Sequence, residues 1–219
     1  MTKPEDILIQ YPAKNKAGEQ IFLESVQEYV QSLGYPVRME LGRLFIIGDM
    51  QQAKFFVLSG TALSGIAVWL ELIHTFPENQ RHKVCFVFCD GKKGTSAFSR
   101  TYGKEIGERL VIQLHHVGDG YHLRLYPTKQ MEENRLRLTS LYRACGYFGT
   151  RDFLVSEEKK PRLLKPYACF PYAVTICALY THKKRLRYNH KTRNTALDTT
   201  NVNILRAALT TFLCCDEVN

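Results

Sequence analysis

The sequence predicts an α/β fold with three layers, in which helices cover both faces of a mixed sheet whose central strands are parallel. Three segments carry this prediction, because each is almost continuously apolar, as strands covered on both faces are: residues 54–58, 83–89 and 110–114. Segments with helical spacing alternate with these strands. With 219 residues, of which 45% are hydrophobic, the chain can form one sizeable core, so we expect one domain over residues 1–219.

The first half of the chain is expected to begin with a helix over residues 18–33, which ends at Gly34. Its apolar residues recur at helical spacing: Ile21, Phe22, Val26, Tyr29, Val30 and Leu33. Short strands are predicted at 37–41 and 44–47, before the strand at 54–58.

A helix over residues 62–76 follows that strand and is apolar on nearly all sides. Thr61 is its predicted N-cap, and Pro77 ends it. Trp69 lies inside this apolar pattern, so we interpret it as a core residue and assign it no ligand.

The second half adds a weaker strand at 121–125, which the turn at Gly118–Gly120 would join to the strand before it as a hairpin. A helix from Thr128 to Gly146 is expected next, with one face formed by Met131, Leu138, Leu141, Tyr142 and Cys145. A buried strand is predicted at 173–179. The last helix should begin at Thr200 or Asn201, with Asp198 as its cap.

Five short segments, read in order, resemble the zinc aminopeptidase and glutaminyl-cyclase family. Their order and spacing over nearly the whole chain carry the resemblance, because each segment alone is short. The segments are Glu24–Val37, Ser64-Gly65-Ile66-Ala67, Phe86-Val87-Phe88-Cys89-Asp90-Gly91, Leu114–Gly118 and Thr192–Asn203. The resemblance implies a zinc-exopeptidase-like fold.

The resemblance also implies where zinc ligands would lie, and this sequence departs from the family at those positions. The family's bridging aspartate falls on Thr61 or its neighbour Gly60, and its two adjacent glutamates, base and ligand, fall on Lys92 and Lys93. A further aspartate ligand falls on His115, and the final histidine falls on Lys191 or, one residue earlier, on His190. The loop with the family's His-x-Asp segment has no counterpart after residue 60.

Lysine at positions 92 and 93 opposes metal binding, because unit charges of like sign about 4 Å apart repel by roughly 4 kcal/mol at an effective dielectric near 20, and zinc carries two charges. A co-catalytic zinc pair also needs a bridging carboxylate and a general base. We therefore expect no zinc cofactor and no catalytic residues, and we interpret the chain as a non-catalytic homologue with a binding or scaffold role.

Two alternatives stay open. The first is a metal-dependent hydrolase with zinc in a rebuilt site formed by His115, His116, Asp119 and His122. If the strand continues through His115 and His116, their side chains point to opposite faces of the sheet, which argues against a shared ion. The second is anion or nucleic-acid binding through the basic residues of 183–193, although a solvated surface explains that run more simply.

The remaining expectations concern partners and location. A basic pocket at the strand ends could bind an anion such as a peptide carboxylate, and we do not expect nucleic acid as the main partner. The sequence has neither a secretory signal nor a membrane span, so a cytoplasmic protein is predicted. Seven cysteines without a CxxC pair indicate buried free thiols in a reducing compartment.

Overall fold

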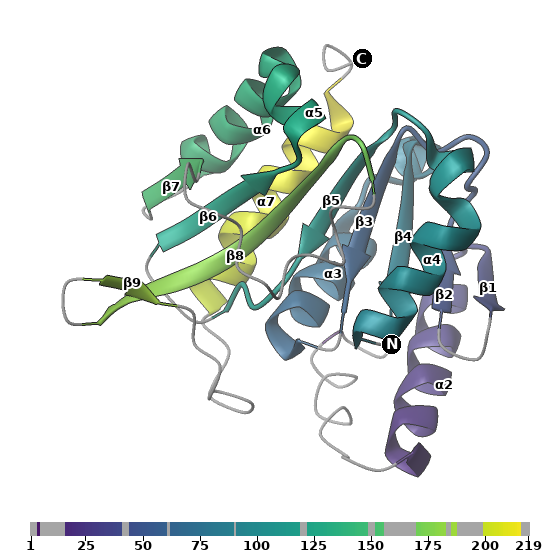
Figure 1. Ribbon diagram of the computed structural model, residues 1–219. Helices are drawn as coiled ribbons and strands as arrows, with labels where there is room; N and C mark the ends of the chain where they lie inside the picture. The colour runs from purple at the N-terminus through teal and green to yellow at the C-terminus, as the bar shows by residue number, and fades with distance from the viewer. Residues whose placement is uncertain are drawn as a thin grey trace.

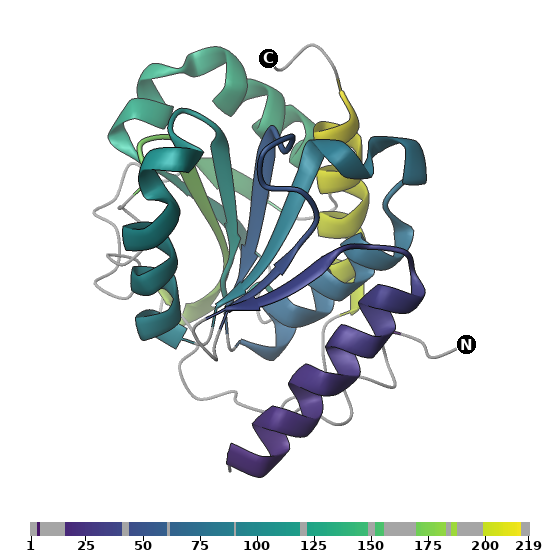
Figure 2. The ribbon, with the colours of Figure 1, turned by 90° about the vertical axis from the view of Figure 1, so that its right-hand side faces the viewer.

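The structure is a computed structural model that describes residue 4 and residues 16–40, 44–60, 62–89, 91–118, 122–148, 152–155, 170–182, 185–187 and 199–215. It contains a mixed sheet covered by helices on both faces, which confirms the predicted fold class (Figures 1 and 2). No helix among these residues combines the length and the apolar character that crossing a membrane requires.

Within the described residues, the sheet contains nine strands, and their order along it is β1-β2-β4-β3-β5-β8-β6-β7, with β9 paired to β8. The central strands β4, β3, β5 and β8 run parallel to one another. The strands are β1 (Val37–Glu40), β2 (Leu44–Ile47), β3 (Phe55–Ser59), β4 (Val84–Cys89), β5 (Leu110–Leu114), β6 (His122–Pro127), β7 (Asp152–Val155), β8 (Ala173–His182) and β9 (Arg185–Arg187).

Helices cover the two faces unequally. The larger core packs residues of α2, α3, α6 and α7 against one face of the sheet, and a smaller core packs α4 against the other. The helices are α2 (Lys16–Ser32), α3 (Leu63–Thr75), the 3-10 helix η1 (Glu78–Lys83), α4 (Gly91–Ile106), α5 (Lys129–Glu133), α6 (Arg135–Phe148) and α7 (Thr199–Cys214).

The end of α2 explains why glycine stands at position 34. Gly34 has a φ of 81°, a left-handed conformation that glycine adopts without steric cost. Its N–H donates to the Gln31 carbonyl at 2.9 Å, and the Tyr35 N–H donates to the Val30 carbonyl at 3.3 Å. This pair of hydrogen bonds is a Schellman motif, and it turns the chain from α2 into β1.

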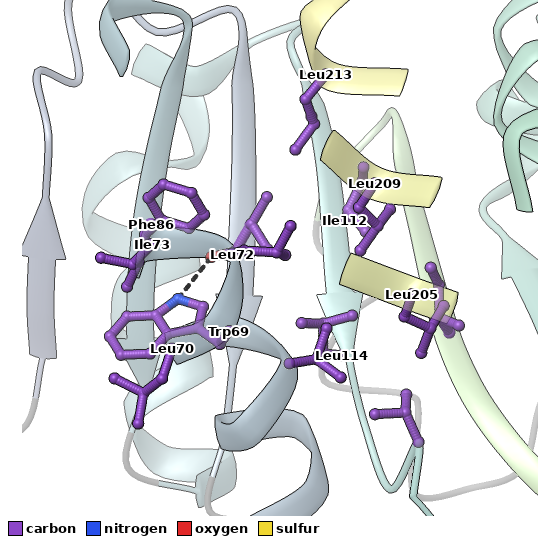
Figure 3. Close-up of a cluster of buried hydrophobic side chains, with 14 of the residues drawn as sticks. Trp69, Leu70, Leu72, Ile73, Phe86, Ile112, Leu114, Leu205, Leu209 and Leu213 are labelled. Atoms are coloured by element: carbon purple, nitrogen blue, oxygen red, sulfur yellow. Dashed lines mark hydrogen bonds between the residues drawn. The ribbon is translucent and has the colours of Figure 1, made fainter. Parts of the chain in front are cut away.

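The larger core is centred on α3, as Figure 3 shows. Trp69 is 1% exposed and its indole Nε1–H donates to the Val57 carbonyl at 3.3 Å, which confirms it as a core residue. Leu205 and Leu209 of α7 are both fully buried in the same cluster. Because α3 and α7 share this core, both helices are fixed against the central strands.

Three sequence predictions about local structure are wrong. The helix expected from Thr128 to Gly146 is two helices, because the chain bends at Asn134, whose Oδ1 accepts the Arg137 N–H at 3.3 Å at the start of α6. Helix α6 continues past Gly146 to Phe148. Tyr142 is 38% exposed and does not share the buried face of α6.

Two further predictions, which concern connections, are also wrong. Strands β5 and β6 do not form a hairpin, because β8 lies between them. The N-cap residue of α3 is Ala62, with no side-chain cap, and the Ile66 N–H donates to the Ala62 carbonyl at 3.0 Å. The predicted cap, Thr61, lies outside the described residues, as does Asp198 before α7.

The described cysteines are free thiols, and most of them are buried, as the sequence predicted: Cys85, Cys89, Cys145 and Cys177 are buried, Cys214 is half-buried and Cys215 is exposed. Burial in apolar surroundings raises the pKa of three of them, Cys85, Cys145 and Cys177, to about 12. These three thiols therefore stay protonated at neutral pH and are not available as thiolate ligands or nucleophiles.

Candidate functional site

The candidate site is the edge of the sheet where the parallel strands β3, β4 and β5 end. Ser59, the last residue of β3, is paired in register with Phe88 of β4 and with Leu114 of β5. The connections after these strands therefore lie side by side at one edge. In open α/β sheets, this edge is where ligands bind.

The connection from β3 to α3 is short, because β3 ends at Ser59 and α3 begins at Leu63. Gly65 in the first turn of α3 lies so close to β5 that an added Cβ would be 3.0 Å from the Leu114 carbonyl oxygen and 3.3 Å from the Ser59 Oγ. Glycine at position 65 thus lets the start of α3 pass directly over the strand ends.

Strand β5 is followed by two adjacent histidines whose rings lie together. The ring centroids of His115 and His116 are 4.7 Å apart, with an angle of 74° between the rings. His116 has a φ of 48°, so the chain leaves the extended conformation there. The condition under which these side chains would point to opposite faces is therefore not met, because the strand ends at Leu114.

The backbone of this pair is held by the neighbouring strand β8. The His115 N–H donates to the Ile176 carbonyl at 3.0 Å, and the His116 carbonyl accepts the Ala178 N–H at 3.0 Å. Both histidines are half-buried. The left-handed residue is thus fixed between hydrogen bonds on either side, which lets the structure maintain an otherwise costly conformation.

Helix α7 also reaches this edge, through Asn201. This residue is fully buried, and its Nδ2–H donates to the Val117 carbonyl at 3.1 Å. From the sequence, Asn201 was predicted only as a possible start of the last helix. A signal for its role was present, because Asn201 precedes Leu205 by one helical turn and so lies on the apolar face of α7.

The connection from β4 to α4 carries the two lysines that the resemblance placed at the site. Strand β4 ends at Cys89 and α4 begins at Gly91, so Lys92 and Lys93 belong to the first turn of this helix. An added Cβ on Gly94 would lie 3.2 Å from the Cys89 carbonyl carbon, so this turn packs closely on the strand end. The first turn contains no acidic residue.

The remaining site positions predicted from the sequence do not lie in the connections after β4 and β5 that the structure describes. Thr61, Asp119, His190 and Lys191 lie outside the described residues. His122 begins β6, which is separated from β5 by β8. Its backbone is thus two strand spacings from β5, about 10 Å.

Few side chains in the described part of the chain are placed to bind a metal ion together. Among those residues, no group of three or more His, Cys, Asp or Glu side chains is placed to hold one metal ion. His115 and His116 could supply two imidazoles, whereas protein zinc sites use three or four protein ligands. The described residues therefore do not reproduce a zinc-exopeptidase ligand set.

Comparison by sequence gives no relative, because no family model and no curated protein matches this chain. Comparison by structure finds similar proteins. Tannerella forsythia glutaminyl cyclase aligns with a TM-score of 0.67 at 10% identity, over 96% of this chain and 95% of that one. A Zn-dependent exopeptidase from Parabacteroides distasonis aligns with a TM-score of 0.63 at 11% identity, over 96% of this chain and 94% of that one.

A larger enzyme is similar over part of its length. The zinc aminopeptidase from Bacillus subtilis aligns with a TM-score of 0.55 at 13% identity, over 77% of this chain and 48% of that chain. At these identities, the likeness concerns the fold. The mixed sheet with parallel central strands, flanked by helices, is the zinc-exopeptidase fold.

Proposed function

We propose that this chain is a non-catalytic homologue of the di-zinc exopeptidases and acts as a binding or scaffold protein. The observation that carries the proposal is the first turn of α4, which one residue, Asp90, separates from β4 in the sequence, and which contains Lys92 and Lys93 but no acidic residue. The resemblance places the general base and one zinc ligand of the family at these two positions.

Electrostatics supports the proposal. The N-terminus of a helix carries a partial positive charge, and the two lysines add formal positive charges to the same turn. A divalent cation near this turn would be repelled by both sources of charge.

The connection from β3 to α3 supports it independently. Only residues 60–62 lie between the end of β3 at Ser59 and the start of α3 at Leu63. This length leaves no room for the loop that carries the family's His-x-Asp ligands. A hydrolase of this family would therefore lack ligands from two separate connections.

The test combines metal analysis with activity assays on the purified full chain. We expect well below one zinc, manganese or cobalt ion per chain, and no hydrolysis of amino-acid p-nitroanilides or cyclisation of N-terminal glutamine peptides after zinc is added. Activity that a chelator abolishes would refute the proposal.

Charge variants sharpen this test. If positive charge at this turn excludes the metal, K93E should bind zinc more tightly than the wild type, as measured by calorimetry. K104E is the matched control, because Lys104 is an exposed lysine in the last turn of the same helix. Equal gains in both variants would indicate a general effect of net charge.

A second candidate is a rebuilt metal site, and the contact between the rings of His115 and His116 favours it. This candidate predicts Co²⁺ binding with visible absorption bands that H115A and H116A each remove. H82A is the control, since His82 is exposed in η1. Absence of these bands in the wild type would eliminate it.

Anion binding through residues 183–193 remains a prediction, because only residues 185–187 of that run are described, as β9. It predicts binding to a phosphate-rich polymer such as heparin or an oligonucleotide that weakens with salt. Binding should also weaken when Lys183, Lys184 and Arg185 are neutralised. Salt-insensitive binding, or none, would remove this candidate.

A further inference from the structure

Among the residues that the structure describes, strand β1 forms one edge of the sheet, with β2 as its neighbour on the inner side. Figure 2 views the molecule from this side. The Arg38 side chain is 54% exposed, and Met39, at 42%, is among the exposed large apolar residues. An open edge strand presents backbone N–H and C=O groups that another strand can pair with.

The backbone groups of β1 that point outward can be assigned from its register. The Gly48 N–H donates to the Pro36 carbonyl at 2.9 Å, so the carbonyl group of residue 36 faces β2. Because backbone polar groups alternate along an antiparallel strand, those of Arg38 and Glu40 also face β2. The N–H and C=O of Val37 and Met39 therefore point away from the sheet.

The side chains of β1 are self-complementary about Met39. If two β1 strands pair antiparallel with Met39 opposite Met39, Arg38 of each copy lies opposite Glu40 of the other. Met39 would then exchange both backbone hydrogen bonds with its symmetry mate. The two Arg38–Glu40 pairs fall at non-hydrogen-bonded positions, where facing side chains are closest.

We propose that two copies of this chain associate through their β1 edges, about a two-fold axis at Met39, to form one continuous sheet. Charge complementarity identifies the occupant as a second copy, because the sequence Arg-Met-Glu matches itself in the antiparallel direction. Within one copy, Arg38 Nη1 lies 3.9 Å from Glu40 Oε1, and Tyr102 of α4 donates to the other Glu40 oxygen. Both charges thus lie on the α4 side of the sheet.

The decisive experiment uses two single variants, R38E and E40R. In a homodimer of R38E, glutamate faces glutamate at both positions, and in a homodimer of E40R, arginine faces arginine. Each variant should therefore be monomeric at concentrations where the wild type dimerises, with dimerisation at least tenfold weaker. A mixture of the two should form a heterodimer, because both facing pairs are then of opposite charge.

Sedimentation velocity over a concentration series measures the association, and native mass spectrometry identifies the heterodimer. R100E on the exposed surface of α4 is the control for net charge and should dimerise like the wild type. E40R also loses the hydrogen bond that Tyr102 donates to Glu40. Y102F removes the same hydrogen bond without a change of charge, so it is the control for this loss and should dimerise. A wild type that stays monomeric throughout the series would overturn the proposal.

A dimer that persists in R38E, or a mixture without heterodimer, would also overturn it, because association would then use another surface. M39P keeps the test decisive if E40R does not fold. Of the backbone donors, proline removes just the outward N–H of residue 39, together with the exposed Met39 side chain, and it is tolerated on edge strands. We expect M39P to be a folded monomer, and a folded M39P dimer would contradict the inference.

Discussion

Gly118 is packed directly against Ser64, so that a Cβ added to Gly118 would lie 2.5 Å from the Ser64 Cβ. This contact joins the connection after β5 to the first turn of α3. Real Cβ atoms essentially never approach other atoms so closely. The contact thus constrains both residues to be small where the strand ends and the helix start meet.

The Gly118 contact predicts that G118A is destabilised by about 1–3 kcal/mol, because the backbone must shift to accommodate the methyl group. Urea unfolding followed by circular dichroism measures the change. G146A is the matched control: Gly146 lies within α6, nothing stands within 4 Å of an added Cβ, and helix propensity favours alanine.

The double variant S64G/G118A tests the cause. Removing the Ser64 Cβ should recover part of the stability lost in G118A, even though S64G alone costs up to about 1 kcal/mol in a helix. If the two losses simply add, the clash with Ser64 is not the source of the destabilisation.

The hydrogen bond from Asn201 to the Val117 carbonyl predicts a second effect on stability. N201L should lower the free energy of unfolding by about 1–3 kcal/mol, because it removes the donor to a buried carbonyl. N203L is the control, since Asn203 is exposed on the same helix and should change stability by less than about 0.5 kcal/mol. Equal losses in the two variants would contradict a specific role for Asn201.

Arg109 forms hydrogen bonds with both the loop before β3 and the end of α4, where its Nε–H donates to the Ile106 carbonyl at 3.0 Å. Its Nη1 donates to the carbonyls of Met50 at 2.6 Å and Ala53 at 3.1 Å, and its guanidinium carbon lies 5.0 Å from the centre of the Phe56 ring. R109K keeps the charge but loses this planar geometry, so we expect a loss of about 1–3 kcal/mol in urea unfolding.

The exposed Arg143 of α6 provides the control for that substitution. R143K should unfold at the wild-type urea concentration, within error. If R109K also matches the wild type, the guanidinium geometry at position 109 contributes nothing measurable.

The buried thiols predict a loss of stability at alkaline pH. Burial raises the pKa of Cys85, Cys145 and Cys177 from 9.0 to about 12 in the folded chain. Below pH 9, the contribution of these thiols to the free energy of unfolding is fully present. It is lost between about pH 9 and 12, because the unfolded chain releases these protons first.

Each such thiol lowers the free energy of unfolding by about 1.4 kcal/mol per pH unit in that range. Urea unfolding between pH 8 and 10.5 gives the slope for the wild type. C177A should show a shallower slope above pH 9, whereas C215A, which removes an exposed thiol, should keep the wild-type slope. An unchanged slope in C177A would contradict the assignment.

Much of the fold could be predicted because local patterns determine it. Strand β2 was predicted with its observed bounds, Leu44–Ile47, and α3 within one residue at each end. Helix α4 was not predicted, because its sequence contains three glycines and only a few large apolar residues. The bend at Asn134 depends on one local hydrogen bond, which the helical pattern does not reveal.

The site was less predictable, because long-range pairing determines it. The insertion of β8 between β5 and β6 excluded the expected hairpin and separated His122 from the histidine pair. Strand β5 ends before the histidine pair, and His116, with its positive φ, has its ring beside that of His115. The glycines at 65 and 118 fit the predicted segments, but their close contacts appear only once the helix and strand ends are in place.

The position of β8 also has a consequence for how the chain folds during synthesis. Strand β6 pairs with β8 from His122 opposite Leu179 onward, so β6 must wait for residues made much later. Until β8 arrives, the growing chain has two unmatched strand edges, one on β5 and one on β6, and such edges favour aggregation. Chains terminated before residue 173 should therefore aggregate, whereas complete chains close the sheet when β8 inserts between the two edges.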